Sequence, residues 1–434
     1  MAELGAAGEP AVLPYASAPN PAAQLKRSAI LIGWAVFVST LTQTAPPYLA
    51  ELPLRGLLQD RIGAPRMATF FLIAMSPWYL KPIAGLLSDA FPLMGTRRRG
   101  YLLVGSILAG ACWLLMGLVP PNFWAVVSVA TATNMMLVVV STALGGALVE
   151  DGQRMGATGR LTSARAAVMY ATVVLSGALG GILAAHRFIV TAAINGLVLF
   201  SLAPVVLVLH REPRASRPNV AALEHGWSQI KLASRSRTIW LGAIMFFLIF
   251  FASGFSSPLY ERLKNQLHYP VQFIGVLGSV SGLAGVLAAI PYARACRRLS
   301  LRVLLLTAIL CSAGAAIPFF ALANRFGAIA AYAGSGFAAA LVEMTALDLA
   351  ARASPPTVEA MGYALMLSAG NFSIYLSDIV GSRLWTLLDY RFTPLIWINA
   401  GSSLLALIAL PLLPRLLVAG REGEGLAAAV TPGA

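Results

Sequence analysis

The stretch at residues 77–101, PWYLKPIAGLLSDAFPLMGTRRRGY, decides the fold. It completes an apolar run that begins near Met67, and it carries a lysine, Lys81, inside that run. If the run is one membrane helix ending near Asp89, Lys81 lies about 12 Å from its end at ~1.5 Å per residue. That depth is near the middle of a hydrocarbon core ~30 Å thick, where a cation is costly and needs a partner or a ligand. We therefore expect this stretch to form one wall of a binding site.

The composition indicates that most of the chain lies in lipid. Of 434 residues, 58% are hydrophobic and 11% are charged, and the mean hydropathy is +0.76. Soluble domains carry about 25% charged residues. The net charge of +14 does not by itself indicate a nucleic-acid partner, because basic residues mark the cytoplasmic side of membrane proteins. The three cysteines and four histidines lack disulfide or metal-ligand spacing, so we expect no metal site and no cofactor.

Twelve apolar runs are long enough to cross a membrane. They lie at residues 28–50, 67–88, 100–119, 123–149, 163–185, 188–209, 238–258, 271–293, 301–322, 326–350, 360–381 and 393–417. The sequence therefore predicts an all-α polytopic membrane protein with twelve transmembrane helices in two six-helix halves.

The longest polar stretch separates these two halves. Its second part carries Leu223, Trp227 and Ile230 on one helical face, which is typical of a short helix on the inner membrane surface. The predicted segments are a disordered cytoplasmic tail at 1–27, a first half at 28–209, a cytoplasmic linker at 210–237, a second half at 238–417 and a cytoplasmic tail at 418–434.

The basic residues predict the orientation. With the N-terminus inside, most of the 31 lysines and arginines fall on the cytoplasmic side, although Arg55, Arg61 and Arg66 fall in the first external loop. We therefore expect both termini to be cytoplasmic in an integral protein of the plasma (inner) membrane.

Two sequence patterns resemble a known family. The first is P-W-x-x-K-P-x-x-G-x-x-S-D-x-x-P-x-x-G-x-R-R-x-x-Y, from Pro77 to Tyr101, and the second is P-P-x-x-E…A-L…S-x-x-N, from Pro355 to Asn371. Both are similar to segments of the folate–biopterin transporters, and two six-span halves joined by a basic linker resemble the major facilitator superfamily. The resemblance implies a secondary active transporter that moves a folate- or pterin-like solute by alternating access, in which the binding site opens to one side of the membrane at a time. It also implies proton symport and a binding site near the membrane midplane.

The resemblance has one clear departure. Members of this family carry aspartates in span four, but here the region at 141–151 reads STALGGALVED and keeps only Glu150 as a counterpart. Another pterin, or a different planar anionic solute, is therefore an alternative to folate itself.

The candidate substrate-binding residues lie in spans two and eleven. Lys81 is expected to bind an anionic group, with Trp78 and Tyr79 framing a planar ring; a structural ion pair is the alternative role for the lysine. Asn371 and Ser368 lie three residues apart on one helical face, where they could bond either a neighbouring helix or the polar edge of a pterin.

The candidate proton-coupling residue is Glu343, roughly 10 Å inside the inner end of span ten. A buried carboxylate binds a proton readily because desolvation disfavours its charged form. The alternative role is that of counter-ion to Lys81.

The remaining charged residues are assigned to gates and structural pairs. Asp89 is expected to form a cytoplasmic charge lock with Arg97 and Arg98. Asp348 and Glu359 are assigned to the same gate, although capping of a helix N-terminus would also explain Glu359.

Two further expectations concern helix contacts. Asp378, toward the external end of span eleven, is expected to pair with Arg383. Glycines of spans five and eight lie at helix-contact spacing and predict close packing, namely Gly177, Gly180, Gly181, Gly275, Gly278, Gly282 and Gly285.

Two other functions stay open at this point. A proton-driven exporter of drugs or other metabolites would share the fold, and a non-transporting membrane receptor or scaffold would share the composition. Nothing resembles a nucleophile–base pair or a phosphate-binding glycine loop, so we expect no enzyme. The expected partners are a small-molecule solute, protons and the lipid bilayer, with no nucleic acid, and we expect a monomer.

Overall fold

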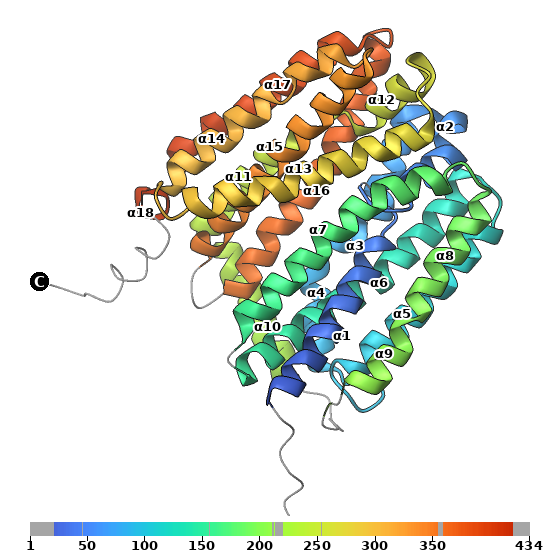
Figure 1. Ribbon diagram of the computed structural model, residues 1–434. Helices are drawn as coiled ribbons and strands as arrows, with labels where there is room; N and C mark the ends of the chain where they lie inside the picture. Colours follow the sequence, from blue (N-terminus) through green and yellow to red (C-terminus); the bar gives the residue numbers. More distant parts are fainter. Residues whose placement is uncertain are drawn as a thin grey trace, which may run out of the picture.

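A computed structural model describes residues 21–45, 47–155, 157–210, 212, 220–252, 254–354 and 359–419, and every named element within these ranges is a helix. The helices before and after the linker form two neighbouring groups (Figure 1), which we call the N-terminal and C-terminal helices. The N-terminal helices are α1 (Pro21–Leu41), α2 (Glu51–Ala74), α3 (Ser76–Tyr79), α4 (Lys81–Ala90), α5 (Arg99–Leu118), α6 (Phe123–Arg154), α7 (Thr158–Leu183), α8 (Phe188–Phe200) and α9 (Leu202–Leu209).

The C-terminal helices follow α10 (Val220–Arg235), which occupies part of the predicted linker. They include two 3-10 turns, at Ile317–Ala321 and Leu410–Leu412, and a π-helical turn at Arg262–Gln266. The α-helices are α11 (Arg237–Phe251), α12 (Ser256–Glu261), α13 (Val271–Ala295), α14 (Leu301–Gly314), α15 (Arg325–Ala353), α16 (Glu359–Leu387), α17 (Phe392–Ala409) and α18 (Arg415–Val418).

The apolar character of these helices confirms an integral membrane fold. Within the described ranges, nine helical segments are long and apolar enough to cross a membrane. They match nine of the twelve predicted spans, whereas those at 28–50, 67–88 and 360–381 have no counterpart among them. The exact number of twelve spans therefore stays a prediction.

The predicted helix at 67–88 is interrupted, where its two prolines were expected only to bend it. The structure divides it into the end of α2, the short α3 and α4, with Leu80 in a non-helical conformation between α3 and α4. Pro77 and Pro82 each lie in the first turn of one of these helices, where their missing N–H costs least. Lys81 therefore stands at the first position of α4, at a helix break instead of in a helix interior.

Small residues bring α7 and α13 into direct backbone contact, which confirms the predicted close packing. A Cβ atom on Gly177 would lie 2.6 Å from the carbonyl oxygen of Gly275, and one on Gly181 would lie 3.1 Å from the Cα of Gly275. Ser279 of α13 completes the contact, since its Oγ donates to the Val174 carbonyl at 2.6 Å and accepts from the Ala178 N–H at 2.8 Å. This crossing joins the N-terminal to the C-terminal helices.

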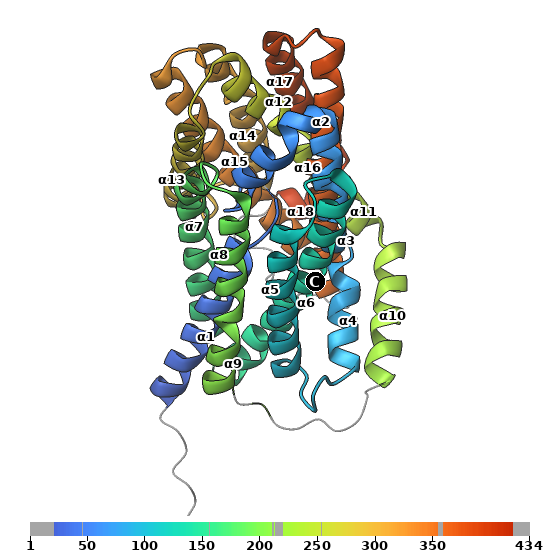
Figure 2. The same cartoon turned by 90° about the vertical axis from the view of Figure 1, so that its right-hand side faces the viewer.

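The linker helix α10 lies beside α4 (Figure 2). Gly226 packs against Leu86 so closely that a side chain at this position would displace it. Trp227 is 56% exposed, whereas Ala233 is fully buried. One face of α10 therefore packs on the protein and another presents an exposed tryptophan.

Candidate functional site

The Lys81 ammonium group is held by polar and aromatic groups rather than by an acid. Its Nζ donates to Ser141 Oγ of α6 at 3.0 Å and lies 5.3 Å from the centre of the Trp78 ring. Trp78 is fixed in turn, because its indole N–H donates to the Asn134 side chain of α6 at 3.2 Å. No described residue forms a salt bridge with Lys81, and the charged group nearest to it electrostatically is Arg165 of α7. The structural ion pair that was the alternative role for Lys81 is therefore absent from the described part of the chain.

Tyr79 lies at the boundary between the two groups of helices. Its ring is 5.6 Å from Phe372 and 6.4 Å from Tyr375, both on α16, measured between ring centres. Its hydroxyl donates to the Leu72 carbonyl at 3.1 Å, which fixes the ring. Tyr79 thus contacts the C-terminal helices directly.

Asn371 and Ser368 lie on the part of α16 that meets Tyr79. Asn371 lies four residues before Tyr375, and Ser368 lies four residues before Phe372. This spacing places all four side chains on one face of the helix. Both polar side chains are half-buried, and neither has a hydrogen bond to another described residue. The structure brings these two predicted residues near Tyr79, with polar groups available to a ligand.

Glu343 does not pair with Lys81. It is half-buried on α15, and its electrostatic neighbours are Tyr48, Tyr170 of α7 and Tyr363 of α16. Within the described ranges it forms no ion pair, so it faces tyrosines from both groups of helices rather than the lysine.

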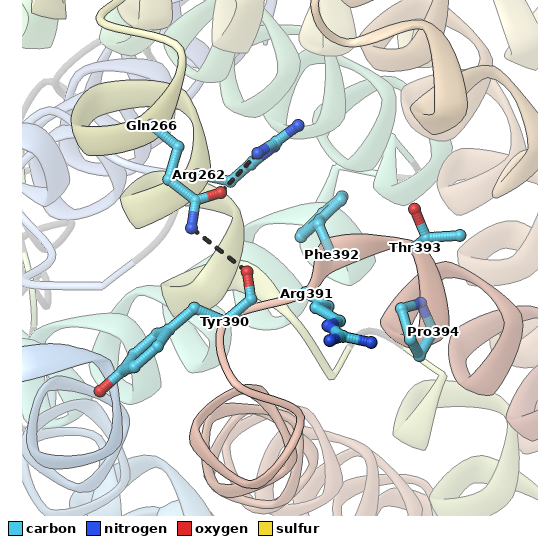
Figure 3. A pocket seen from close by; sticks show the side chains of 7 residues that line it. All are labelled: Arg262, Gln266, Tyr390, Arg391, Phe392, Thr393 and Pro394. Atoms are coloured by element: carbon cyan, nitrogen blue, oxygen red, sulfur yellow. Dashed lines mark hydrogen bonds between the residues drawn. The ribbon is translucent and has the colours of Figure 1, made fainter.

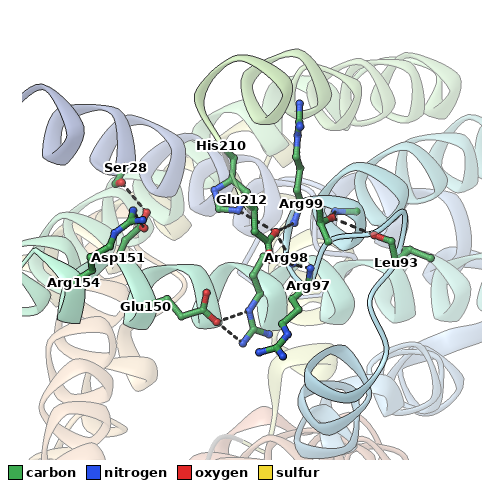
Figure 4. A network of polar contacts seen from close by, with 12 residues as sticks. Ser28, Leu93, Arg97, Arg98, Arg99, Glu150, Asp151, Arg154, His210 and Glu212 are labelled. Carbon is green, nitrogen blue, oxygen red and sulfur yellow. Dashed lines mark hydrogen bonds and ion pairs between the residues drawn. The ribbon is translucent and has the colours of Figure 1, made fainter. Parts of the chain in front are cut away.

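Arg98 belongs to a polar network at one end of the bundle, which we call the Arg98 end (Figure 4). Its guanidinium binds Glu150 Oε1 through Nη2 at 2.9 Å and Nε at 3.1 Å, and it donates to Ser88 Oγ at 3.2 Å. Glu150 is the acid that span four retains. The side chain of Asp89 lies outside the described residues, so the lock of Asp89 with Arg97 and Arg98 stays a prediction.

A linker carboxylate that the sequence analysis missed binds the same loop. Glu212 accepts the backbone N–H groups of Arg97, Arg98 and Arg99 at 2.8–2.9 Å, and His210 lies 3.6 Å away (Figure 4). Burial alone would raise the pKa of Glu212, but His210 and the three N–H donors outweigh it and lower that pKa to about 2. The available signal was an acid in a basic linker opposite the N-terminus of α5, where anions bind well.

The other two predicted gate residues, Asp348 and Glu359, show no contact with the N-terminal helices in the described part of the chain. Asp348 pairs with Arg352, four residues further along the same helix, at 2.9 Å. The side chain of Glu359 lies outside the described residues. No gate contact between the two groups of helices is described for either residue.

The opposite end, the Arg55 end, carries a buried network that the sequence analysis also missed. The Arg55 side chain is fully buried, and it donates to Glu51 (3.0 Å) and Gln59 (2.8 Å) on its own helix. It also reaches α12, where it donates to Ser257 Oγ at 3.0 Å and Ser256 Oγ at 2.8 Å. Arg55 was expected in an external loop. The i, i+4, i+8 spacing of Glu51, Arg55 and Gln59 was the signal that they share one helical face.

Asp378 completes this network, and its predicted pairing with Arg383 is wrong. Asp378 is 4% exposed and accepts from the backbone N–H of Ser257 at 2.9 Å and from its hydroxyl at 2.7 Å. Arg383 is exposed instead. We call Glu51, Arg55, Gln59, Ser257 and Asp378 the Arg55 clamp, because they tie α2 of the N-terminal helices to α12 and α16 of the C-terminal helices.

A surface pocket of about 800 Å³ opens at the C-terminal end of α16 (Figure 3). Its lining residues are Arg262, Gln266, Tyr390, Arg391, Phe392, Thr393 and Pro394. None of them belongs to the predicted site. Within the described ranges, no group of three His, Cys, Asp or Glu side chains is arranged to hold a metal ion.

Family comparisons match most of the chain. A model described as the BT1 family matches residues 54–327, and one described as the Major Facilitator Superfamily matches residues 242–432.

Two relatives bear names that describe transport. The chain is 30% identical to a "Folate-biopterin transporter" of Synechocystis, over 84% of this chain and 78% of that protein. It is 22% identical to "Folate transporter 1" of Plasmodium falciparum, over 77% of this chain and 69% of that protein.

Solved structures agree on the fold. A D-xylose-proton symporter aligns with a TM-score of 0.65 at 14% identity, over 91% of this chain and 98% of the symporter. A bacterial homologue of the lysosomal transporter Spinster aligns with a TM-score of 0.59 at 14% identity, over 93% of this chain and 96% of that protein. At this identity the likeness concerns the fold alone.

Proposed function

Because the chain belongs to the BT1 family of folate–biopterin transporters, within the Major Facilitator Superfamily, we propose that it moves folate- or pterin-like solutes by alternating access. It is an integral membrane transporter and not an enzyme. The observation that carries the proposed solute class is the 30% identity to the Synechocystis protein over 84% of the chain. Beyond the solute class, we propose which residues bind the solute, which ion is coupled to transport and how the protein is oriented in the membrane.

Lys81 is the proposed anion-binding residue. Its ammonium group is neutralised by no described carboxylate, while Ser141 and the Trp78 ring fix its position. An anionic solute group supplies the missing charge in a site where a lone cation is costly. Trp78 and Tyr79 then offer flat surfaces to a pterin ring, and Asn371 and Ser368 bond its donor and acceptor edge.

Glu343 is the proposed proton-coupling residue. It faces tyrosines of α7 and α16, so its carboxylate touches the boundary that alternating access rearranges. Burial favours its protonated form when that boundary is closed, and contact with water favours the charged form when it is open. A proton gradient could therefore drive the cycle.

The proposed orientation places the Arg98 end in the cytoplasm, with both termini, and the protein in the plasma (inner) membrane as a monomer. In this arrangement the halves at 28–209 and 238–417 rock about the solute. The cytoplasmic gate comprises Asp89, Arg97, Arg98, Asp348 and Glu359, and the Arg55 clamp closes the external side.

Uptake into proteoliposomes tests this function. Labelled folate, biopterin and related pterins are supplied with and without an inward proton gradient. We expect saturable, gradient-dependent uptake that Lys81→Ala lowers at least about tenfold, because a lost charge-assisted bond costs about 1.5–3 kcal/mol.

Two matched variants separate the roles. Lys231→Ala removes an exposed lysine of α10 and should leave uptake unchanged. Glu343→Gln should retain solute binding but abolish the response to the gradient. If the folded protein moves neither folate nor any pterin, the proposed solute class is wrong.

A further inference from the structure

The Arg55 clamp holds more negative than positive charge. Arg55 interacts with two carboxylates, those of Glu51 and Asp378. Lys264, which lies near the same Tyr260 ring as Arg55, already pairs with Asp60. One guanidinium therefore serves one half-buried acid and one buried acid, and a buried carboxylate whose charge is incompletely compensated is costly unless it binds a proton.

The two acids differ in how they reach the guanidinium. Glu51 accepts directly from Arg55 Nε at 3.0 Å, and its side chain remains 21% exposed. Asp378 is more deeply buried and has no direct bond to Arg55: its partners are the backbone of Ser256 and Ser257 and the Ser257 hydroxyl, which donates to Asp378 Oδ2 and accepts from Arg55 Nη1. Asp378 thus contacts the cation through a hydroxyl, so it is the acid whose charged form is held less firmly.

The groups around Asp378 come from several helices. From α2 it faces Glu51 and Arg55, and on its own helix it faces Tyr375. Tyr332 of α15 faces the Glu51–Arg55 pair. From α12, Glu261 accepts the indole N–H of Trp385 at 2.9 Å. Among these described groups Arg55 alone carries a positive charge, and the remaining support for the charged Asp378 carboxylate comes from hydrogen bonds of Ser256 and Ser257.

We propose that Asp378 is a proton-binding site that opens the Arg55 clamp. A proton from the aqueous phase at the Arg55 end adds to the Asp378 carboxylate and leaves a neutral acid. The charge-assisted bonds from Ser257 weaken, and its hydroxyl is no longer held in place to accept from Arg55. Arg55 also loses the attraction of the Asp378 carboxylate on α16, so α2 separates from α12 and α16.

The consequence for transport rests on the alternating access proposed above. The solute reaches Lys81 from the Arg55 end only after the clamp releases, so protonation of Asp378 precedes or accompanies solute entry. This proton site is separate from Glu343, which lies on α15 among other tyrosines.

The test measures the clamp itself, without solute. Spin labels are placed on Gly56→Cys of α2 and Leu387→Cys of α16, two exposed positions on helices that the clamp joins. The background carries serine in place of the native cysteines Cys112, Cys296 and Cys311. Distances are measured by pulsed electron spin resonance in the full chain in liposomes at pH 8 and pH 5.

We expect the ratio of long to short distances to rise about tenfold at pH 5, as fits the loss of one charge-assisted contact. Asp378→Asn, which mimics the neutral acid, should give the long distance at both pH values. Asp389→Asn removes an exposed acid at the same end of α16 and should behave like the unsubstituted protein. A short distance at both pH values in the unsubstituted protein, or a full pH response in Asp378→Asn, overturns the proposal.

Ser257→Ala provides a second variant should Asp378→Asn fail to fold. It keeps the carboxylate but removes the hydroxyl that links it to Arg55. The fraction of molecules with the long distance should therefore already be raised at pH 8. A distance distribution in Ser257→Ala that equals that of the unsubstituted protein at pH 8 contradicts the proposed link from Asp378 to Arg55 through the Ser257 hydroxyl. Because no solute is present, failure here leaves the transport of pterins untouched, and absence of pterin uptake leaves this result standing.

Discussion

The Arg55 end and the Arg98 end of the bundle use charge in different ways. At the Arg55 end, hydrogen bonds of a fully buried arginine cross from α2 to α12, and Asp378 of α16 supports them. At the Arg98 end, the described ion pairs stay within one group of helices: Arg98 binds Glu150, and Asp348 binds Arg352. Substitutions at the first end should therefore change how the two groups sit together, and substitutions at the second should act locally.

The largest expected effect is that of Arg55→Gln. It leaves the half-buried Glu51 and the buried Asp378 without a cation, and removal of one partner of a buried pair costs about 3–5 kcal/mol of folding stability. Thermal unfolding in detergent should show a clear drop in the midpoint. Arg61→Gln, an exposed arginine of the same helix, is the control. Equal midpoints for the two variants would show that the clamp contributes nothing to stability.

Gly177→Ala should have the next largest effect. The new Cβ would lie 2.6 Å from the Gly275 carbonyl oxygen, so α7 and α13 must move apart at a cost of about 1–3 kcal/mol. Gly145→Ala is the matched control, because a Cβ there meets nothing within 4 Å. Unfolding midpoints of the two variants give the comparison, and a smaller loss for Gly177→Ala than for Gly145→Ala contradicts the close approach.

Arg98→Gln should destabilise the protein by about 1 kcal/mol, since its partner Glu150 is 53% exposed and water screens the pair. Arg97→Gln, whose described contact is through its backbone, should have less effect. The distance between labels at Gly56 and Leu387 should not change in either variant. A change in that distance would show that the Arg98 end also controls the opposite end.

Glu212→Gln should have the smallest effect, and it should depend on pH. The pKa of Glu212 lies at about 2, below its ordinary value of 4.5, so its contribution to stability is complete above pH 4.5 and is lost as the pH falls toward 2. At pH 7 the variant should unfold about 0.5 °C lower, a smaller shift than that of Arg98→Gln. Near pH 2 the difference should vanish, and a difference that grows with acidity contradicts the assigned sign.

The sequence predicted the fold class because membrane helices can be recognised from the length and apolar composition of their segments. It also singled out Lys81, since a cation within an apolar run is informative by itself. It misjudged the local backbone there, because the effect of Pro77 and Pro82 depends on where each helix restarts. The position of the helix break therefore depends on packing in three dimensions, which the local sequence does not specify.

The Arg55 clamp was beyond sequence reasoning for a different reason. Arg55 and Ser257 are 202 residues apart, and no local spacing connects them. Asp378 had a nearby arginine, Arg383, at plausible helical spacing, so the local pair was favoured over the distant one. Glu212 was missed because its partners are backbone N–H groups, which every residue but proline carries.

The crossing of α7 and α13 has a mechanical consequence. The residues at the closest approach, Gly177, Gly181 and Gly275, carry no side chains that must pass one another when the helices rotate, and the Ser279 hydroxyl holds the crossing through its two hydrogen bonds to α7. Such a contact acts as a pivot: the Ser279 bonds fix where the two groups of helices meet, while the missing side chains leave room for a change in their angle. A small rotation at this pivot becomes a larger displacement at the far ends of both helices.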